Sequence, residues 1–309
     1  MFGSCASSGI SEANGGLYKS AEGKAVCHAS YDRAMKLWNV DYEEEWVETD
    51  FGSTHIITAG PEEGKPVFLL PGLFADATMW YANVGALAQS YRVYAVDLPV
   101  YGGKSEVSER SITDISGYTV WFSALLQHYR YEQTAVAGLS YGSWLSLALS
   151  REMPASISAL IMLDPSETFA NMRSIMLWKG LWHFMIFPSR QKYISFFDWM
   201  GGGYSDPQLD IWFEHMLDVI EYGSIGMMDV PQHRVYSRDE LRMLTMPVLI
   251  LAGGKPIIYK NPEAFAAAAA RALPHAEIEI VPNAGHSLNM EKPAQVNERI
   301  LRFLGEYYQ

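Results

Sequence analysis

The stretch TAVAGLSYGSWLSLALS, residues 134 to 150, decides the fold. Its first third has the composition of a buried strand and its last part has helical spacing. Between them lies Gly138-Leu139-Ser140-Tyr141-Gly142, a G-x-S-x-G pentapeptide. In a sharp strand–turn–helix connection the serine sits at the tip, and both flanking positions need glycine because a Cβ would strike the neighbouring chain. We predict that Ser140 is a nucleophile, and a purely structural turn is the alternative.

Short apolar runs bounded by turn residues recur on both sides of this motif. They are PVFLL (66–70), YRVYAVDL (91–98), ALIMLDP (159–165), PVLILAG (247–253) and AEIEIVP (276–282). Strands that are apolar at nearly every position are typical of a parallel sheet covered on both faces. Helical patterns alternate with them, at 113–129, 143–153, 261–273 and 291–308. An alternating stretch at 43–60 predicts an antiparallel hairpin at the sheet edge. The fold class is therefore α/β, with a mostly parallel central sheet flanked by helices.

One interval breaks this rhythm. Residues 166–237 are rich in Trp, Phe, Met and Tyr, with helical spacing and no convincing strand. A structureless loop of that length is implausible in a compact domain, so we predict a helical cap inserted over the carboxyl edge of the sheet. The predicted core is then 41–165 with 238–309. Residues 1–40 form an N-terminal arm, whose Ser/Gly/Ala-rich start suggests a loose segment.

Bulk composition narrows the function. The 309 residues are 49% hydrophobic and 19% charged, as in ordinary globular proteins, and the net charge of -12 argues against binding nucleic acid. Two cysteines, Cys5 and Cys27, make no disulfide framework, and free thiols in a reducing cytosol are the simpler reading. The start does not resemble a signal peptide, and no stretch is long and apolar enough for a membrane span. We expect a cytoplasmic protein.

A serine hydroxyl needs a base within hydrogen-bond reach. His286, in Asn283-Ala284-Gly285-His286, follows the last predicted strand, from where it can reach the carboxyl edge. We predict His286 as the general base. The remaining histidines lack this placement and are interpreted as structural: His28, His55, His128, His183, His215, His233 and His275.

Attack on an acyl carbonyl also needs amide donors for the developing oxyanion. One predicted donor is the N–H of Tyr141, directly after the nucleophile. The other is that of Leu73, with that of Phe74 as a further candidate, in the loop after the first core strand, where Gly72 lets the backbone approach closely. A plain strand-to-helix turn is the alternative interpretation of this loop.

Together these segments, with Asp97-Leu98-Pro99 and Asp164-Pro165-Ser166-Glu167-Thr168-Phe169, resemble the α/β-hydrolase superfamily over roughly residues 40 to 308. The likeness is greatest to serine carboxylesterases related to bacterial naproxen esterase. It implies a cap inserted after the sixth strand of the family's sheet. It further implies hydrolysis of a small-molecule ester through an acyl-enzyme, with no cofactor or metal, and we expect the ester to carry an apolar group. A lactonase, thioesterase, C–C hydrolase or perhydrolase activity, or a non-catalytic ligand-binding protein, are the alternatives.

Two departures from the family's pattern stand out. Such enzymes usually have His-Gly where this chain has Pro71-Gly72, so a polar anchor of the loop is missing. The family's acid usually follows the penultimate strand, where this chain has GGKPIIYK (253–260), without a carboxylate. The triad acid orients the imidazole and stabilises the imidazolium, which a lysine cannot do. We predict that Asp164, at the end of the strand after the nucleophile strand, takes this role; Glu167, Glu263 and Asp229 are alternatives, as is the absence of an acid.

Asp97 also ends a predicted strand but precedes the nucleophile. We interpret it as a structural residue that braces a loop. Some aromatic and methionine side chains of the cap are expected to line an apolar pocket, but the sequence does not select which of them.

Overall fold

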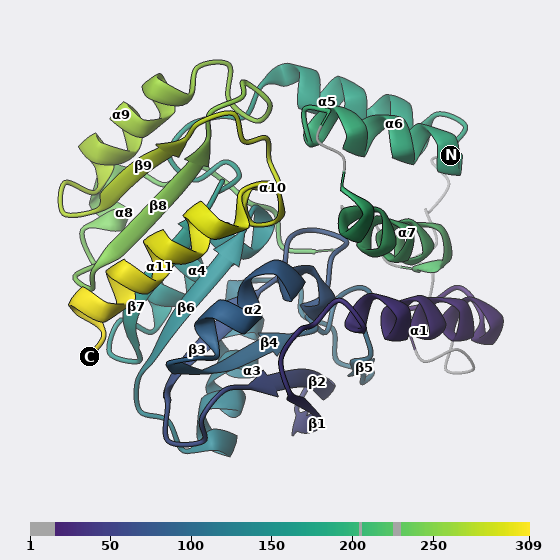
Figure 1. Cartoon of the computed structure of the whole chain (residues 1–309), viewed down its shortest axis with the longest axis horizontal. Coiled ribbons are helices and arrows are strands. Elements are labelled where there is room, and N and C mark those ends of the chain that lie inside the picture. Colours follow the sequence, from purple (N-terminus) through teal and green to yellow (C-terminus); the bar gives the residue numbers. More distant parts are fainter. Residues whose placement is uncertain (1–15, 204–205, 225–229) are drawn as a thin grey trace, which may run out of the picture.

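The computed structural model describes residues 16–203, 206–224 and 230–309. In these ranges nine strands form one sheet, shown in Figure 1, in the order β1-β2-β4-β3-β6-β7-β8-β9, with β5 pairing β2. The strands are β1 (Tyr42–Thr49), β2 (Gly52–Ala59), β3 (Lys65–Leu70), β4 (Tyr91–Val96), β5 (Glu106–Val107), β6 (Thr134–Leu139), β7 (Ile157–Leu163), β8 (Val248–Gly253) and β9 (Glu277–Val281).

The strand pattern of the sequence is confirmed. The six strands β4, β3, β6, β7, β8 and β9 run parallel to one another. The predicted edge hairpin is the antiparallel pair β1–β2, and β2 joins the sheet antiparallel to β4. The central strands are buried at every position from Thr134 to Leu139 and from Val248 to Gly253, which explains their unbroken apolar character.

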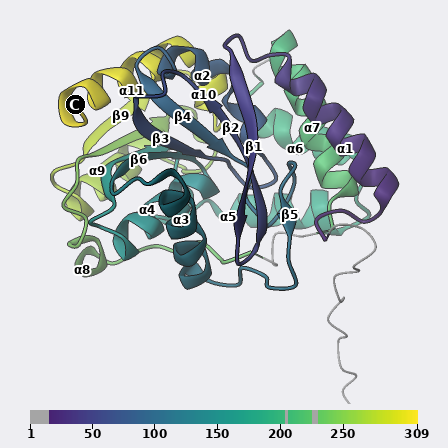
Figure 2. The same ribbon diagram turned by 90° about the horizontal axis from the view of Figure 1, so that it is seen from below.

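Helices cover both faces of the sheet, as Figure 2 shows. One face carries η2 (Ala77–Trp80), α2 (Tyr81–Leu87), α10 (Leu288–Glu291) and α11 (Pro293–Tyr307). The other carries α3 (Ile115–Tyr129), α4 (Tyr141–Glu152), α8 (Arg238–Leu241) and α9 (Pro262–Ala272). The side chains of Asp114 and Asn261 cap the starts of α3 and α9. The apolar core therefore lies in two layers, one on each side of the sheet.

The interval 166–237, called here the cap segment, contains helices, as its spacing predicts. They are α5 (Ser174–Gly180), η3 (Leu181–Met185), α6 (Arg190–Met200) and α7 (Pro207–Tyr222). In Figure 1 they lie beside the sheet, at the upper right. No helix in the described part of the chain is long and apolar enough to cross a bilayer.

The structure differs from the expected N-terminal arm in residues 21–35. These form a regular helix, α1 (Ala21–Met35), with Ser20 as its N-cap. It packs along α7 of the cap segment (Figure 2). Residues 1–15, which include most of the predicted loose start and Cys5, lie outside the described residues. Cys27 is a buried free thiol on α1.

Candidate active site

Ser140 sits at the tip of the turn between β6 and α4. Its backbone has φ 55° and ψ -115°, a conformation that L-residues rarely adopt. Two hydrogen bonds join the turn to Leu163, the last residue of β7. The N–H of Ser140 donates to the carbonyl of Leu163 (2.9 Å), and the Ser143 hydroxyl accepts from the N–H of Leu163 (2.8 Å). Strain of this kind persists only where the surroundings impose it, and it aims the Ser140 side chain outward.

Both glycines of the pentapeptide are sterically required. A Cβ on Gly138 would overlap the backbone of Gly142, and a Cβ on Gly142 would overlap the carbonyl of Leu70 on β3. Both glycines have φ outside the left-handed region, so the requirement is one of space rather than of backbone angle. The turn of β6 into α4 therefore packs directly against its own helix and against the end of β3.

Asp164 and His286 are in direct contact, although 122 residues separate them in the chain. The imidazole Nδ1 of His286 lies 2.6 Å from Oδ2 of Asp164, and both side chains are almost completely buried. Asp164 lies just past β7 with φ 39°, and its N–H donates to the carbonyl of Leu251 (2.7 Å). With Nδ1 engaged by a carboxylate, Nε2 is the ring nitrogen of His286 that could accept a proton.

The loop of residues 253–260, which has no carboxylate, contacts Asp164 through its backbone. The N–H of Gly253, at the end of β8, donates to Oδ1 of Asp164 (3.0 Å). Further along, Lys255 N–H donates to Ala284 O (2.9 Å), which ties this loop to the loop of His286. The Lys255 ammonium donates to the carbonyl of Gly202 in the cap segment (3.0 Å). Thus the loop orients Asp164 through a backbone amide, and its lysine binds the cap.

Sequence reasoning missed Glu291, which braces the loop of His286. Its carboxylate accepts from the N–H of Gly285 (2.6 Å) and from that of Ser287 (3.2 Å), on both sides of the histidine. Burial raises the pKa of Glu291, although these amides and the charge of Lys255 partly oppose the shift. The only signal in the sequence was its position five residues after His286, on the short helix α10.

The predicted oxyanion donors lie on the wall of the same cavity as Ser140. Tyr141 is the first residue of α4, where backbone N–H groups have no partner within the helix. On the opposite side, Ala75 N–H donates to Gly72 O (3.1 Å) and closes a turn around Leu73 and Phe74. Phe74 has φ 63°. Leu73, in the loop after β3, and Tyr141, at the start of α4, therefore both lie on the wall of the cavity that Ser140 lines.

This cavity has a volume of about 740 Å³, within the range of small-molecule sites. Ser140 and His286 both line this cavity. Both residues belong to the part of the chain that the structure describes, and no hydrogen bond joins the serine hydroxyl to the imidazole. In unliganded sites this contact is often long and tightens only with substrate. Most of the wall is apolar and comes from the cap segment, including Leu177, Phe184, Phe197, Trp212, Phe213 and Met216.

The other candidate acids that the structure describes, Glu167 and Glu263, do not contact His286. Glu167 also lines the cavity but faces His233, with its Oε2 3.6 Å from Nε2. Burial lowers the pKa of His233, and the charge of Glu167 opposes this. Glu263 is exposed on α9. Asp229 lies outside the described residues.

Asp97 braces loops, as predicted. Its Oδ1 accepts from the N–H of Ala77 (2.8 Å) and its Oδ2 from that of Lys104 (2.7 Å). Oδ2 also lies 2.7 Å from Nδ1 of His55, whose Nε2 lies 3.0 Å from Glu44. Burial alone would lower the pKa of His55, but these two carboxylates outweigh it and raise the pKa to about 9.

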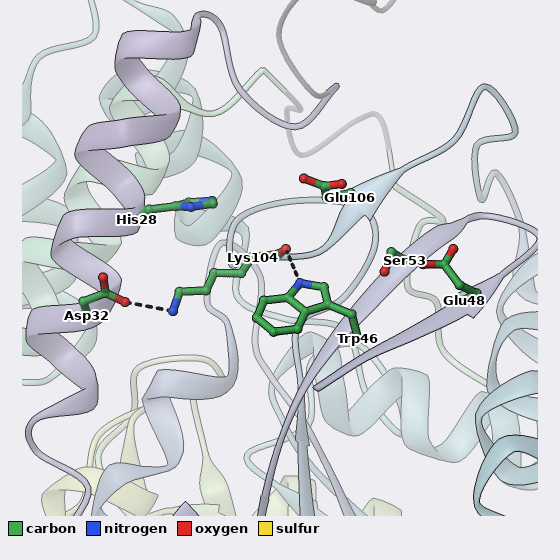
Figure 3. A pocket seen from close by; sticks show the side chains of 7 residues that line it. All are labelled: His28, Asp32, Trp46, Glu48, Ser53, Lys104 and Glu106. Atoms are coloured by element: carbon green, nitrogen blue, oxygen red, sulfur yellow. Dashed lines mark hydrogen bonds and ion pairs between the residues drawn. The ribbon is translucent and has the colours of Figure 1, made fainter. Parts of the chain in front are cut away.

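A second hollow, of about 520 Å³, lies between α1 and the β1–β2 hairpin (Figure 3). Lys104 crosses it to pair with Asp32 of α1 (2.8 Å), and the indole N–H of Trp46 donates to the carbonyl of Lys104 (3.4 Å). These contacts fasten α1 to the core. Among the described residues, no group of three or more His, Cys, Asp or Glu side chains is arranged to hold a metal ion.

The fold and this constellation of residues define an enzyme class. The Alpha/beta hydrolase family matches residues 67–299, and the chain belongs to that family. It is 28% identical to the uncharacterized carboxylesterase nap of Bacillus subtilis, over 89% of this chain and 91% of that protein. Carboxylesterase YbfK of the same organism is also 28% identical, over 90% and 93%. The crystal structure of naproxen esterase from Bacillus subtilis superposes with a TM-score of 0.83 at 29% identity, covering 92% of this chain and 98% of that one.

Proposed function

We propose that the protein is a serine carboxylesterase that hydrolyses small-molecule esters through an acyl-enzyme, with Ser140, His286 and Asp164 as its triad. The observation that carries the proposal is the 2.6 Å contact between Asp164 and His286, which lines the same cavity as Ser140. The likeness to carboxylesterases along nearly the whole chain supports the choice of an ester bond.

The chemistry follows from the positions of these groups. The Ser140 hydroxyl attacks the ester carbonyl while its proton passes to Nε2 of His286. Asp164 stabilises the resulting imidazolium at Nδ1, and the amides of Leu73 and Tyr141 hold the negative oxygen. The intermediate collapses, the alcohol leaves with the proton from Nε2, and the acyl group stays on Ser140. Water then attacks the acyl-enzyme and gives up its proton to His286. As the bond between the acyl carbon and the Ser140 oxygen breaks, His286 returns this proton to Ser140 and the acid is released.

The apolar lining of the cavity supports a substrate with an apolar group. The cap segment supplies most of an apolar lining, so the preferred ester carries an apolar acyl or alcohol group. The chemistry needs no metal or organic cofactor. We further propose a cytoplasmic location and the domain division into a core of 41–165 with 238–309 and a cap of 166–237.

Hydrolysis of p-nitrophenyl butyrate tests the proposal, with Ser140→Ala as the matched control. We expect turnover by the native chain and loss of nearly all of it in the variant. A fluorophosphonate should label the native chain at Ser140 and leave the variant unlabelled. Equal activity of the two proteins, or an unreactive Ser140 in the native chain, would favour a ligand-binding protein on this scaffold.

A further inference from the structure

The loop that presents Leu73 ends at a buried aspartate. Asp76 follows the turn closed by Ala75, and its Oδ1 accepts from the N–H and the hydroxyl of Thr78, at 3.1 and 2.5 Å. In this way Asp76 caps η2. Asp76 is 1% exposed, so its carboxylate has lost nearly all contact with water. Next to it, the N–H of Ala77 donates to Asp97 (2.8 Å), so the end of this loop is held both by Asp97 and by the partners of Asp76.

The second oxygen of Asp76 is held by the cap segment. His215, on α7, places Nε2 at 2.6 Å from Oδ2 of Asp76. On the other side of the ring, the Ser30 hydroxyl of α1 lies 2.8 Å from Nδ1. Burial alone would favour a neutral carboxyl, but the contacts with His215 and Thr78 keep the pKa of Asp76 below its usual value. Three segments distant in sequence meet at one ion pair.

Ser30, His215 and Asp76 are hydrogen-bonded in the sequence Ser–His–Asp, as in a catalytic triad, but a substrate cannot reach them. Ser30, His215 and Asp76 are each at most 2% exposed, and none of them lines the cavity. Ser30 donates its own proton to the carbonyl of Cys27 (3.0 Å) within α1. The arrangement is therefore a clamp between elements and not a second reaction centre.

The helix that carries His215 also forms part of the cavity wall. Trp212 and Met216, one turn apart on α7, line the cavity, and His215 lies between them in the chain. Pro71 gives the loop no donor of its own, because it lacks both a polar side chain and a backbone N–H. The contact from α7 thus supplies polar anchoring from the cap. If α7 moved away, Asp76 would be left as a buried unpaired charge, which is costly.

We propose that His215 is a positioning residue: through Asp76 it ties α7 to the loop of Leu73, so that the oxyanion site is complete only when the cap is seated. This role rests on the proposed esterase function. It predicts that loosening the contact harms the transition state more than the binding of substrate, since the oxyanion forms only in the former.

A pair of variants separates positioning from general stability. His215→Gln keeps an amide N–H near the place of Nε2, facing Asp76, whereas His215→Asn can reach only the side of Ser30. With p-nitrophenyl butyrate, we expect the Asn variant to lose about tenfold to a hundredfold in kcat with KM within about twofold, the cost of a small misplacement of a catalytic group. Its affinity for a trifluoromethyl ketone, which forms an oxyanion on Ser140, should fall by a similar factor. The Gln variant should keep most of both.

Hydrogen–deuterium exchange supplies a readout that does not need activity. Peptides covering residues 71–80 should exchange faster in the Asn variant than in the Gln variant and the native chain, while peptides of β6 stay unchanged. Equal losses in the two variants, a change in KM alone, or unchanged exchange over 71–80 would overturn the positioning role. If the native chain hydrolyses no ester but the exchange result holds, the esterase proposal fails and the clamp remains.

Discussion

Replacing Asp164 by asparagine changes one atom of the proposed triad and leaves its packing nearly intact. The Asn oxygen can still accept from the N–H of Gly253, as Oδ1 of Asp164 does now. Its NH₂ group then faces His286 Nδ1, which must become an acceptor. The imidazole proton therefore moves to Nε2, the atom that has to take the proton from Ser140.

The expected loss follows from this tautomer. In a serine hydrolase, the same exchange costs roughly 10⁴ in kcat, which is about 5 kcal/mol of transition-state stabilisation. We expect a fall of three to four orders of magnitude, roughly, in turnover of p-nitrophenyl butyrate, with KM little changed. Urea denaturation and circular dichroism of the variant check that its fold is preserved.

Glu167→Gln is the matched control, because Glu167 lines the same cavity but contacts His233 and not the proposed base. Its activity should stay within about threefold of the native value, as for other changes outside the reacting groups. A loss of less than about tenfold in Asp164→Asn, or a larger loss in Glu167→Gln, would refute the relocated acid.

The remaining predictions concern the supports of the site. Gly142→Ala should lower the free energy of unfolding by several kcal/mol and abolish activity, because its Cβ would overlap the carbonyl of Leu70. Calorimetry that shows the stability of the native chain would contradict this. The folded-state pKa of Glu291 is raised, so its contribution to stability falls as pH rises above its unfolded pKa of about 4.3. Glu291→Gln should remove this fall in urea titrations started below that pH, and a native stability that does not decrease there would contradict the prediction. The pKa of His55 is raised to about 9, so its stabilisation is complete below its unfolded pKa of about 6.5 and is lost as pH rises through about 9. His55→Gln should remove this loss, roughly 3 kcal/mol at most, and a native stability constant from about pH 7 to 10 would contradict the prediction.

The sheet could be predicted from the sequence because each central strand is buried on both faces and therefore apolar throughout. The turn at Ser140 could also be predicted, because its two glycines are required by close contacts with residues a few positions away and with the adjacent strand. Asp164 could be placed at the correct edge of the sheet because parallel strands share their carboxyl ends. Its contact with His286 depends on the shapes of two loops, which local pattern does not determine.

What the sequence concealed lies in polar contacts between distant segments. Helix α1 buries positions at helical spacing, but several of them are small or polar, including Gly23, Ser30 and Ala34, so no apolar stripe marks it. His215 was interpreted as an ordinary structural histidine, because its partner Asp76 is 139 residues away in the chain. Nothing in a single sequence relates such a pair.

The most direct measurement is mass spectrometry of the enzyme acid-quenched during turnover of p-nitrophenyl butyrate, with the modified peptide sequenced. The proposed mechanism predicts a butyryl group on Ser140, and its absence from the Ser140→Ala variant. A butyryl group on another residue, or turnover of the native chain in which Ser140 is never acylated, would contradict it.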